Sequence, residues 1–202
     1  MTVTINGTTG IQNVLGSASA PAESNTTNSN TGLYFPTGTT LGLSTNGTVA
    51  VSIDASQNST FATGATVTTS NLVLTNAAEP STVSATAATG TINFDVLTQS
   101  VLYYTSNASA NWTVNFRGNS GTSLNSFMTT NQTITVAFLV TQGSTAYYNS
   151  AVTIDGNSVT PKWQGGTAPS AGDASSIDVY TYSIIKTASA TFTVLASLTK
   201  FA

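Results

Sequence analysis

Residues 177–201, IDVYTYSIIKTASATFTVLASLTKF, constrain the fold more than any other stretch of the chain. Tyr180, Tyr182 and Ile184 share one face of an extended chain, because successive side chains of a strand point to opposite sides. After a polar break at residues 186–189, apolar side chains again recur at every second position. This pattern predicts a long β-hairpin. An uncovered strand at a sheet edge invites aggregation, so we expect the hairpin to pair with strands formed upstream.

The chain carries very little charge for its length. Charged residues make up 5% of its 202 residues, against roughly a quarter in an ordinary soluble domain. Apolar residues still make up 40%, whereas disordered chains combine few apolar residues with many like charges. The sequence therefore predicts a folded chain made mostly of β-strands.

Charge and residue types exclude several functional classes. Four Lys and Arg residues against seven Asp and Glu residues provide no basic stripe for phosphates, so we expect no nucleic-acid partner. No apolar run approaches the length of a membrane span and the first residues do not resemble a signal peptide, so we expect a chain made in the cytosol without membrane insertion. Because His and Cys are absent, no Ser-His-Asp site and no imidazole or thiolate metal site can form. We predict no metal, no cofactor and no catalytic residue.

Composition and turn signals divide the chain into three parts. Residues 1–31 are predicted to be an attachment strand and a polar linker. Residues 32–90 hold a β-hairpin stem and a second linker; Asn46-Gly47 indicates the hairpin, since both central residues of a type I′ turn need positive φ. In residues 91–202, alternating apolar runs separated by Asn, Gly and Ser favour an antiparallel, jelly-roll-like β-sandwich. The fold class is therefore predicted to be all-β.

Residues 32–58, GLYFPTGTTLGLSTNGTVAVSIDASQN, close on a short motif of Ile53, Asp54, Gln57 and Asn58. This segment resembles a repeat of fibre and other virion proteins of tailed bacteriophages, those of cyanobacterial phages most of all. The first residues, MTVTINGTTGI, and the C-terminal hairpin resemble proteins of the same family. The tail Val-Gly-Ile-Gly-Thr that often follows in the family is replaced here by STFATG.

The resemblance implies a non-enzymatic structural component of the virion, assembled in the host cytoplasm. It implies a homotrimer whose N-terminal segment docks to other virion proteins and whose C-terminal domain faces outward. A tail fibre or adhesin fits this description, and so does a capsid decoration or head-fibre protein, because 202 residues is short for a fibre that must reach a host. Independently of the resemblance, a β-chain with so few charges has little protection against edge pairing, which favours an oligomer.

Carboxylates are the remaining candidates for catalysis. Two acids at a suitable separation hydrolyse glycosidic bonds, and four aspartates of the C-terminal domain are available: Asp95, Asp155, Asp173 and Asp178. A carbohydrate-processing enzyme is thus the alternative from another class. The four residues have no diagnostic spacing, which favours roles at turns and strand ends.

A binding surface is predicted around aromatic residues and the few charges beside them. Trp163 lies in the loop of residues 161–176, where its polar and glycine neighbours indicate partial exposure and stacking on a host-surface glycan. The alternative is an oligomer contact or a loop anchor, and the sequence favours this alternative. Two further rings come from adjacent tyrosine pairs, in which one ring points inward and the other outward. The predicted contact residues are Trp163, Lys162, Asp173, Tyr104 and Tyr148.

Overall fold

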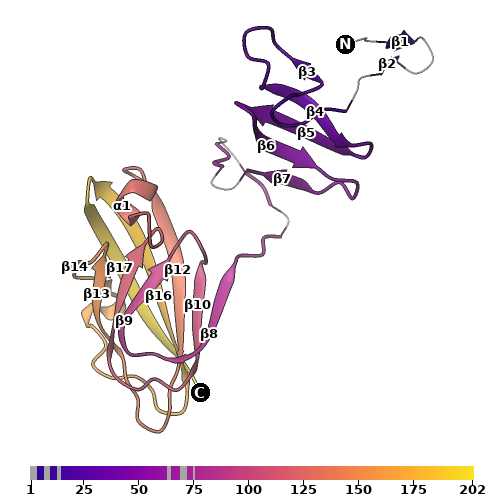
Figure 1. The fold of residues 1–202 in the computed structure, drawn as a ribbon. Coiled ribbons are helices and arrows are strands. Elements are labelled where there is room, and N and C mark those ends of the chain that lie inside the picture. The colour runs from indigo at the N-terminus through magenta and orange to yellow at the C-terminus, as the bar shows by residue number, and fades with distance from the viewer. Residues whose placement is uncertain (1–3, 7–9, 13–14, 63–64, 69–71, 75) are drawn as a thin grey trace. The chain divides into compact units, whose positions relative to one another are not determined.

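The computed structural model describes residues 4–6, 10–12, 15–62, 65–68, 72–74 and 76–202. The chain divides into two compact units, Met1–Val73 and Leu74–Ala202, which Figure 1 shows as ribbons. Both units are built from strands, and α1 (Leu124–Phe127) is the one α-helix among the described residues. The predicted all-β fold is confirmed.

The N-terminal unit contains two antiparallel sheets. Its strands are β1 (Thr4–Asn6), β2 (Gly10–Gln12), β3 (Glu23–Ser24), β4 (Gly32–Thr37), β5 (Thr40–Thr45), β6 (Thr48–Ile53) and β7 (Ser59–Phe61). β1 pairs with β2, and β3 to β7 form a five-stranded sheet in sequence order (Figure 1). The predicted Asn46-Gly47 hairpin is confirmed, because the two residues have φ of 50° and 76° and join β5 to β6.

The polar segment before β4 is more ordered than a linker. Within residues 16–31, Pro21 and Ala22 are buried, and β3 pairs with β4. Small side chains allow the chain to approach closely here: an added Cβ at Gly32 would collide with the Glu23 carbonyl. The composition of this segment predicted a flexible linker, which is wrong. The segment is ordered by contacts with the sheet, and local sequence does not reveal such contacts.

The motif that follows Ile53 forms the turn between β6 and β7. The Asp54 carboxylate accepts hydrogen bonds from the backbone N–H groups of Ser56 and Asn58, each at 2.9 Å. The Asn58 side chain donates to the second carboxylate oxygen at 3.0 Å, and this bond holds the pKa of Asp54 below its usual value. The residues of this motif therefore have a local structural role.

The five-stranded sheet has two unlike faces. On one face Tyr34 is buried, and its ring lies where a Cβ on Gly42 would collide with it. On the other face, side chains of β4, β5, β6 and β7 are register partners and stand in one line across the sheet. This apolar row consists of Leu33, Leu43, Val51 and Phe61. Leu43 is 45% and Phe61 53% exposed while Leu33 and Val51 are partly buried, so the described residues leave the apolar row partly uncovered.

The C-terminal unit is a sandwich of a six-stranded and a four-stranded sheet (Figure 1). The six-stranded sheet has the order β15-β17-β16-β12-β10-β8, and the four-stranded sheet the order β14-β13-β11-β9. The strands are β8 (Ser81–Ala87), β9 (Gly90–Asp95), β10 (Val101–Ser106), β11 (Trp112–Arg117), β12 (Thr133–Thr141), β13 (Asn149–Ile154), β14 (Asn157–Val159), β15 (Lys162–Trp163), β16 (Ile177–Ala188) and β17 (Thr191–Phe201).

The chain crosses between the two sheets at every step from β8 to β13. Strands that neighbour each other in one sheet are therefore two apart in the sequence, and β8, β10 and β12 pair in parallel, as do β9, β11 and β13. The sandwich is confirmed, while the predicted antiparallel pairing holds only for β12, β16, β17 and the β13–β14 hairpin. A jelly roll has antiparallel neighbours, so this sandwich departs from that arrangement. Alternation of side chains is the same in parallel and antiparallel strands, which is why the sequence did not distinguish them.

Aromatic rings fill the core between the two sheets. Trp112 packs edge-to-face on Phe138 and Tyr180, with ring centroids 6.0 and 5.7 Å apart. Tyr182 packs on Phe116 at 4.9 Å. Tyr180 and Tyr182 lie on the inward face of β16, and Trp112 is a core residue. The predicted closing hairpin is confirmed, because β16 pairs with β17 along its length. The two-residue strand β15 pairs with Leu195 and Ala196 of the final strand and so covers part of this edge.

The C-terminal unit begins earlier than the predicted boundary of residue 91. β8 starts at Ser81, directly after Pro80, and pairs along most of its length with β10. Val101 pairs with Ser81 and Tyr104 with Ser84. The predicted second linker thus contributes the edge strand of the six-stranded sheet. Its Ser, Thr and Ala residues concealed it, since an edge strand buries little apolar surface.

Candidate functional site

A concavity of the C-terminal unit surrounds Trp163 and has a volume of about 790 Å³. β15 and the loop that follows it form one side, and the end of β17 forms the other. The lining residues are Trp163, Gln164, Thr167, Ala168, Pro169, Ser170, Ala171, Leu198, Thr199 and Lys200. We call this the Trp163 groove. It offers one aromatic ring, one amide, several hydroxyls and one ammonium group.

Trp163 is both a wall of the groove and an anchor of the loop. Its ring meets Tyr180 and Tyr182 edge-to-face, with centroids 6.3 and 6.2 Å apart. β15 is only two residues long, and Trp163 pairs with Ala196 of β17. The indole is half-buried, because these contacts cover part of it while the groove leaves the rest accessible. The sequence-based alternative of a loop anchor therefore describes part of its role.

A buried carboxylate holds the end of the loop. Asp178 is fully buried, and its Oδ2 accepts hydrogen bonds from the Gln142 side chain at 3.0 Å and from the Asp173 backbone N–H at 3.2 Å. Burial raises the pKa of the Asp178 carboxyl, against the effect of these hydrogen bonds. The chain passes so closely here that a Cβ on Gly172 would collide with the carbonyl of Tyr147. The loop is thus attached to the sandwich at Trp163 and at Asp178.

The two predicted charged contacts occupy different places. Asp173 lies 4.0 Å from the Lys200 ammonium group across an exposed gap, a distance at which an ion pair contributes little. Lys200 lines the Trp163 groove, whereas Lys162 is exposed and lines a neighbouring cavity of about 400 Å³. Nothing in the local sequence indicates Lys200 as a contact, because only the pairing of β16 with β17 places it beside the loop.

The two predicted tyrosines do not line the Trp163 groove. Tyr104 points inward and packs edge-to-face on Phe138 with centroids 5.5 Å apart. Tyr148 is half-buried, and its backbone N–H donates to the Asn111 side chain at 3.1 Å. The structure therefore brings together Trp163, Asp173 and Lys200, and leaves Tyr104 and Tyr148 apart from them.

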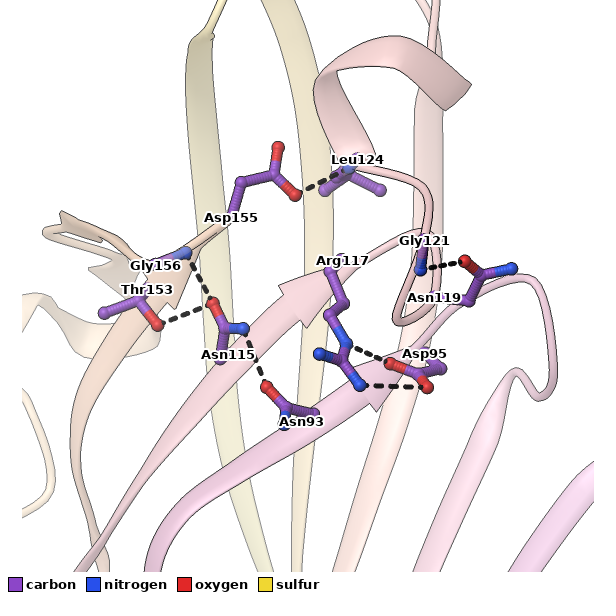
Figure 2. A network of polar contacts seen from close by, with 10 residues as sticks. All are labelled: Asn93, Asp95, Asn115, Arg117, Asn119, Gly121, Leu124, Thr153, Asp155 and Gly156. Atoms are coloured by element: carbon purple, nitrogen blue, oxygen red, sulfur yellow. Dashed lines mark hydrogen bonds and ion pairs between the residues drawn. The ribbon is translucent and has the colours of Figure 1, made fainter.

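A second polar site lies on the outer face of the four-stranded sheet, where Figure 2 shows its side chains. Asn115 of β11 accepts from Thr153 at 2.8 Å and donates to Asn93 at 2.8 Å. In the next row, Arg117 contacts Asp95 with two bonds of 2.6 and 3.4 Å. A cavity of about 450 Å³ adjoins this ladder. The alternation of polar residues with Trp112, Val114 and Phe116 in β11 is the signal that locates this face in the sequence.

Each of the four candidate catalytic aspartates has a structural partner. Asp95 pairs with Arg117, Asp173 lies near Lys200, and Asp178 is buried under the loop. Asp155 accepts hydrogen bonds from the backbone N–H groups of Leu124 and Asn125, at 2.6 and 3.0 Å, at the start of α1. These contacts favour the interpretation of the aspartates as turn and strand-end residues.

The residue types and contacts of the described regions define a charge-poor all-β protein with an open polar groove beside a tryptophan. No protein family, curated protein or solved structure matches the chain. Within the described residues, no group of three acidic, His or Cys side chains is placed to hold a metal ion. No described helix is long and apolar enough to cross a membrane.

Proposed function

We propose that the chain is a non-enzymatic structural protein of a phage virion that assembles as a homotrimer through its N-terminal unit. The observation that carries the proposal is the apolar row of the five-stranded sheet. A sheet with one apolar face is stable when that face is covered, and Leu43 and Phe61 are about half exposed. Copies of the same unit provide a matching apolar face.

The charges of the N-terminal unit support assembly from identical copies. Its sequence contains Glu23 and Asp54 as its only acidic residues and neither Lys nor Arg. Identical units therefore approach with little repulsion and have few charges to remove from water. The resemblance of residues 32–58 to trimeric phage proteins also supports assembly through this unit. The hairpin in this segment supplies β5 and β6, which carry Leu43 and Val51 of the apolar row.

In this proposal the N-terminal segment also docks to other virion proteins and the C-terminal sandwich faces outward. The protein is a tail fibre, or a capsid decoration or head-fibre protein. Electron microscopy of virions labelled with an antibody against the sandwich distinguishes these locations. Absence of the protein from purified virions contradicts the proposal.

Assembly is tested by sedimentation of the purified full-length chain at micromolar concentration. We expect a trimer, which dissociates when Leu43→Lys or Phe61→Lys places a charge in the apolar row. Thr39→Lys is the matched control, because Thr39 is exposed in the β4–β5 turn and outside the row. A monomeric wild-type chain, or equal assembly of all four proteins, overturns the proposal.

The Trp163 groove favours a second candidate function, adhesion to a host-surface glycan. An aromatic ring beside hydroxyl, amide and ammonium groups suits a sugar, whose faces are apolar and whose rim is polar. Gln164→Ala and Thr167→Ala remove groove polar groups without removing the Trp163 anchor. We expect both variants to weaken adsorption of particles to host cells, with unfolding unchanged. Unaltered adsorption excludes this candidate.

The alternative of a carbohydrate-processing enzyme has a direct test. Release of reducing sugar from host polysaccharide, lost in Asp95→Asn or Asp178→Asn, would replace the proposal by an enzymatic function. The bonds of Asp95 to Arg117 and of Asp178 to the loop support a structural role for both carboxylates.

A further inference from the structure

The outer face of the six-stranded sheet, directed away from the four-stranded sheet, carries in-register rows of uncharged side chains. One row crosses β8, β10, β12, β16 and β17 and consists of Val83, Tyr103, Leu139, Val179 and Thr199. The adjacent row consists of Ser81, Val101, Ala137, Thr181 and Ser197. We call this surface the uncharged face. Exposed apolar side chains also stand at its margins, with Val83 at 64%, Leu195 at 44% and Phe201 at 57%.

Charges are directed away from this face by the alternation of side chains. The five long strands contain only three charged residues, which are Asp178, Lys186 and Lys200. All three share the side of their strands that carries the core residues Tyr180, Ile184 and Ala196. In residues 76–202, which the structure describes without a gap, the strands of this sheet bring one charge to the face, that of Lys162 on the two-residue edge strand β15.

The other outer face of the same sandwich is built differently. The four-stranded sheet presents the ladder of Asn93, Asn115, Asp95 and Arg117 in Figure 2, in which polar groups bond to each other. The two faces come from one charge-poor chain, so overall composition does not explain the difference. A sheet face that stays in water needs charged or hydrogen-bonded polar groups, which prevent other chains from associating with it. The uncharged face has few of them: the charge of Lys162 at one edge, and the bonds of Thr135 to Ser183 at 3.1 Å and of Thr141 to Tyr103 at 3.4 Å.

We infer that the uncharged face is an interface to a second copy of this chain. Its size is sufficient: strands about 4.8 Å apart and about 3.3 Å per residue give a surface on the order of 600 Å² in projection. This approaches the roughly 800 Å² per partner of a stable interface. Mixed aliphatic, Ser and Thr side chains are self-complementary, and copies of this face can converge on a common axis with few charges to remove from water. The choice of a copy as occupant rests on the proposed homo-oligomeric assembly.

The test uses the absence of cysteine from the natural chain, so that one introduced thiol reports one position. Leu195→Cys lies on the uncharged face, and Thr91→Cys lies exposed on the outer face of the four-stranded sheet. In the purified full-length oligomer we expect the Leu195→Cys thiol to react with a maleimide about tenfold more slowly than in the dissociated chain, as for a contact of moderate affinity. The Thr91→Cys thiol should react equally in both states.

A second pair of variants tests the same face without a thiol. Thr181→Lys places a charge at the centre of the uncharged face, and Thr113→Lys places one on the outer face of the four-stranded sheet. We expect sedimentation to detect weaker association for Thr181→Lys alone, with unchanged circular dichroism in both variants.

An oligomer that leaves Leu195→Cys fully reactive and tolerates Thr181→Lys overturns this inference but not the proposed trimer. If Leu43→Lys dissociates the oligomer and Thr181→Lys does not, this inference is likewise overturned while the proposed trimer stands. Protection only in intact virions assigns the face to another virion protein and overturns the choice of a second copy, while a monomeric wild type overturns both proposals.

Discussion

The contacts of Trp163 change the effect on stability that we expect from replacing this residue. As an exposed loop residue it would be replaceable without loss of stability. Its contacts with Tyr180 and Tyr182 instead make it part of the covering of the core. A ligand experiment based on Trp163→Ala would therefore confuse lost binding with lost folding, and the groove is better tested through Gln164 and Thr167.

We predict that Trp163→Ala lowers the free energy of unfolding by about 2 kcal/mol, less than a fully buried tryptophan would. Thermal unfolding should shift down by several degrees. Trp163→Phe keeps an aromatic ring on the two tyrosines and should recover about half of the loss. Calorimetry of the three proteins checks this result, and an unchanged melting temperature for Trp163→Ala would show that the ring does not anchor the loop.

Asp178 is predicted to make stability depend on pH. Because burial raises its pKa in the folded state, the folded chain holds this proton more tightly than the unfolded chain. The contribution to stability is fully present below the ordinary carboxyl pKa of about 4 and is lost as the pH rises through the higher folded-state pKa. Urea midpoints measured from pH 4 upward should therefore contain a falling component in the wild type.

Asp178→Asn provides the control for this pH dependence. An amide oxygen can still accept from Gln142 and from the Asp173 N–H, but it does not titrate in this range. The falling component should disappear in the variant. If both proteins have parallel stability curves, the carboxyl of Asp178 does not have a raised pKa.

The short helix α1 depends on elements distant in the sequence rather than on its own four residues. Asp155, in the β13–β14 turn, accepts from the N–H groups at the helix start. At the helix end, the buried Lys186 of β16 donates to the carbonyls of Asn125 and Met128, at 2.5 and 2.8 Å. These bonds satisfy terminal backbone groups that a four-residue helix cannot satisfy internally.

We predict that Asp155→Ala destabilises the C-terminal unit by about 1–2 kcal/mol, the range for losing a carboxylate that caps a helix start. Hydrogen exchange should rise first at the amides of Leu124 and Asn125. Ser158→Ala, in the exposed strand β14 of the same hairpin, is the control and should change neither measurement. Equal exchange in both variants would mean that the loop before β12 is held by other contacts.

At the scale of the whole molecule, the position of β8 decides where the C-terminal unit can be separated. A chain of residues 74–202 keeps this strand, whereas a chain of residues 91–202 exposes the edge of β10. We predict cooperative unfolding for the longer chain, and lower stability with concentration-dependent aggregation for the shorter one. Thermal unfolding with light scattering compares them, and equal behaviour of the two chains would place the boundary near residue 91.

The sequence by itself determined the elements whose signals are local. Alternation located the closing hairpin and placed Tyr180 and Tyr182 on one face, and Asn46-Gly47 located a turn, because side-chain direction and positive φ depend on adjacent residues. The same kind of signal, Asp155-Gly156, marks the β13–β14 turn, which the sequence analysis did not use.

Only the tertiary structure decided how those elements pair. Parallel winding, the strand β8 and the burial of Asp178 depend on contacts between residues far apart in the chain, and alternation is identical for either strand direction. The same limit applies to the candidate site, since Trp163 was found from its neighbours while Lys200 joined it through the register of β16 and β17. The alternation of side chains along a strand places each residue on one face. The packing of the sheets decides whether that face contacts the core, the solvent or another surface.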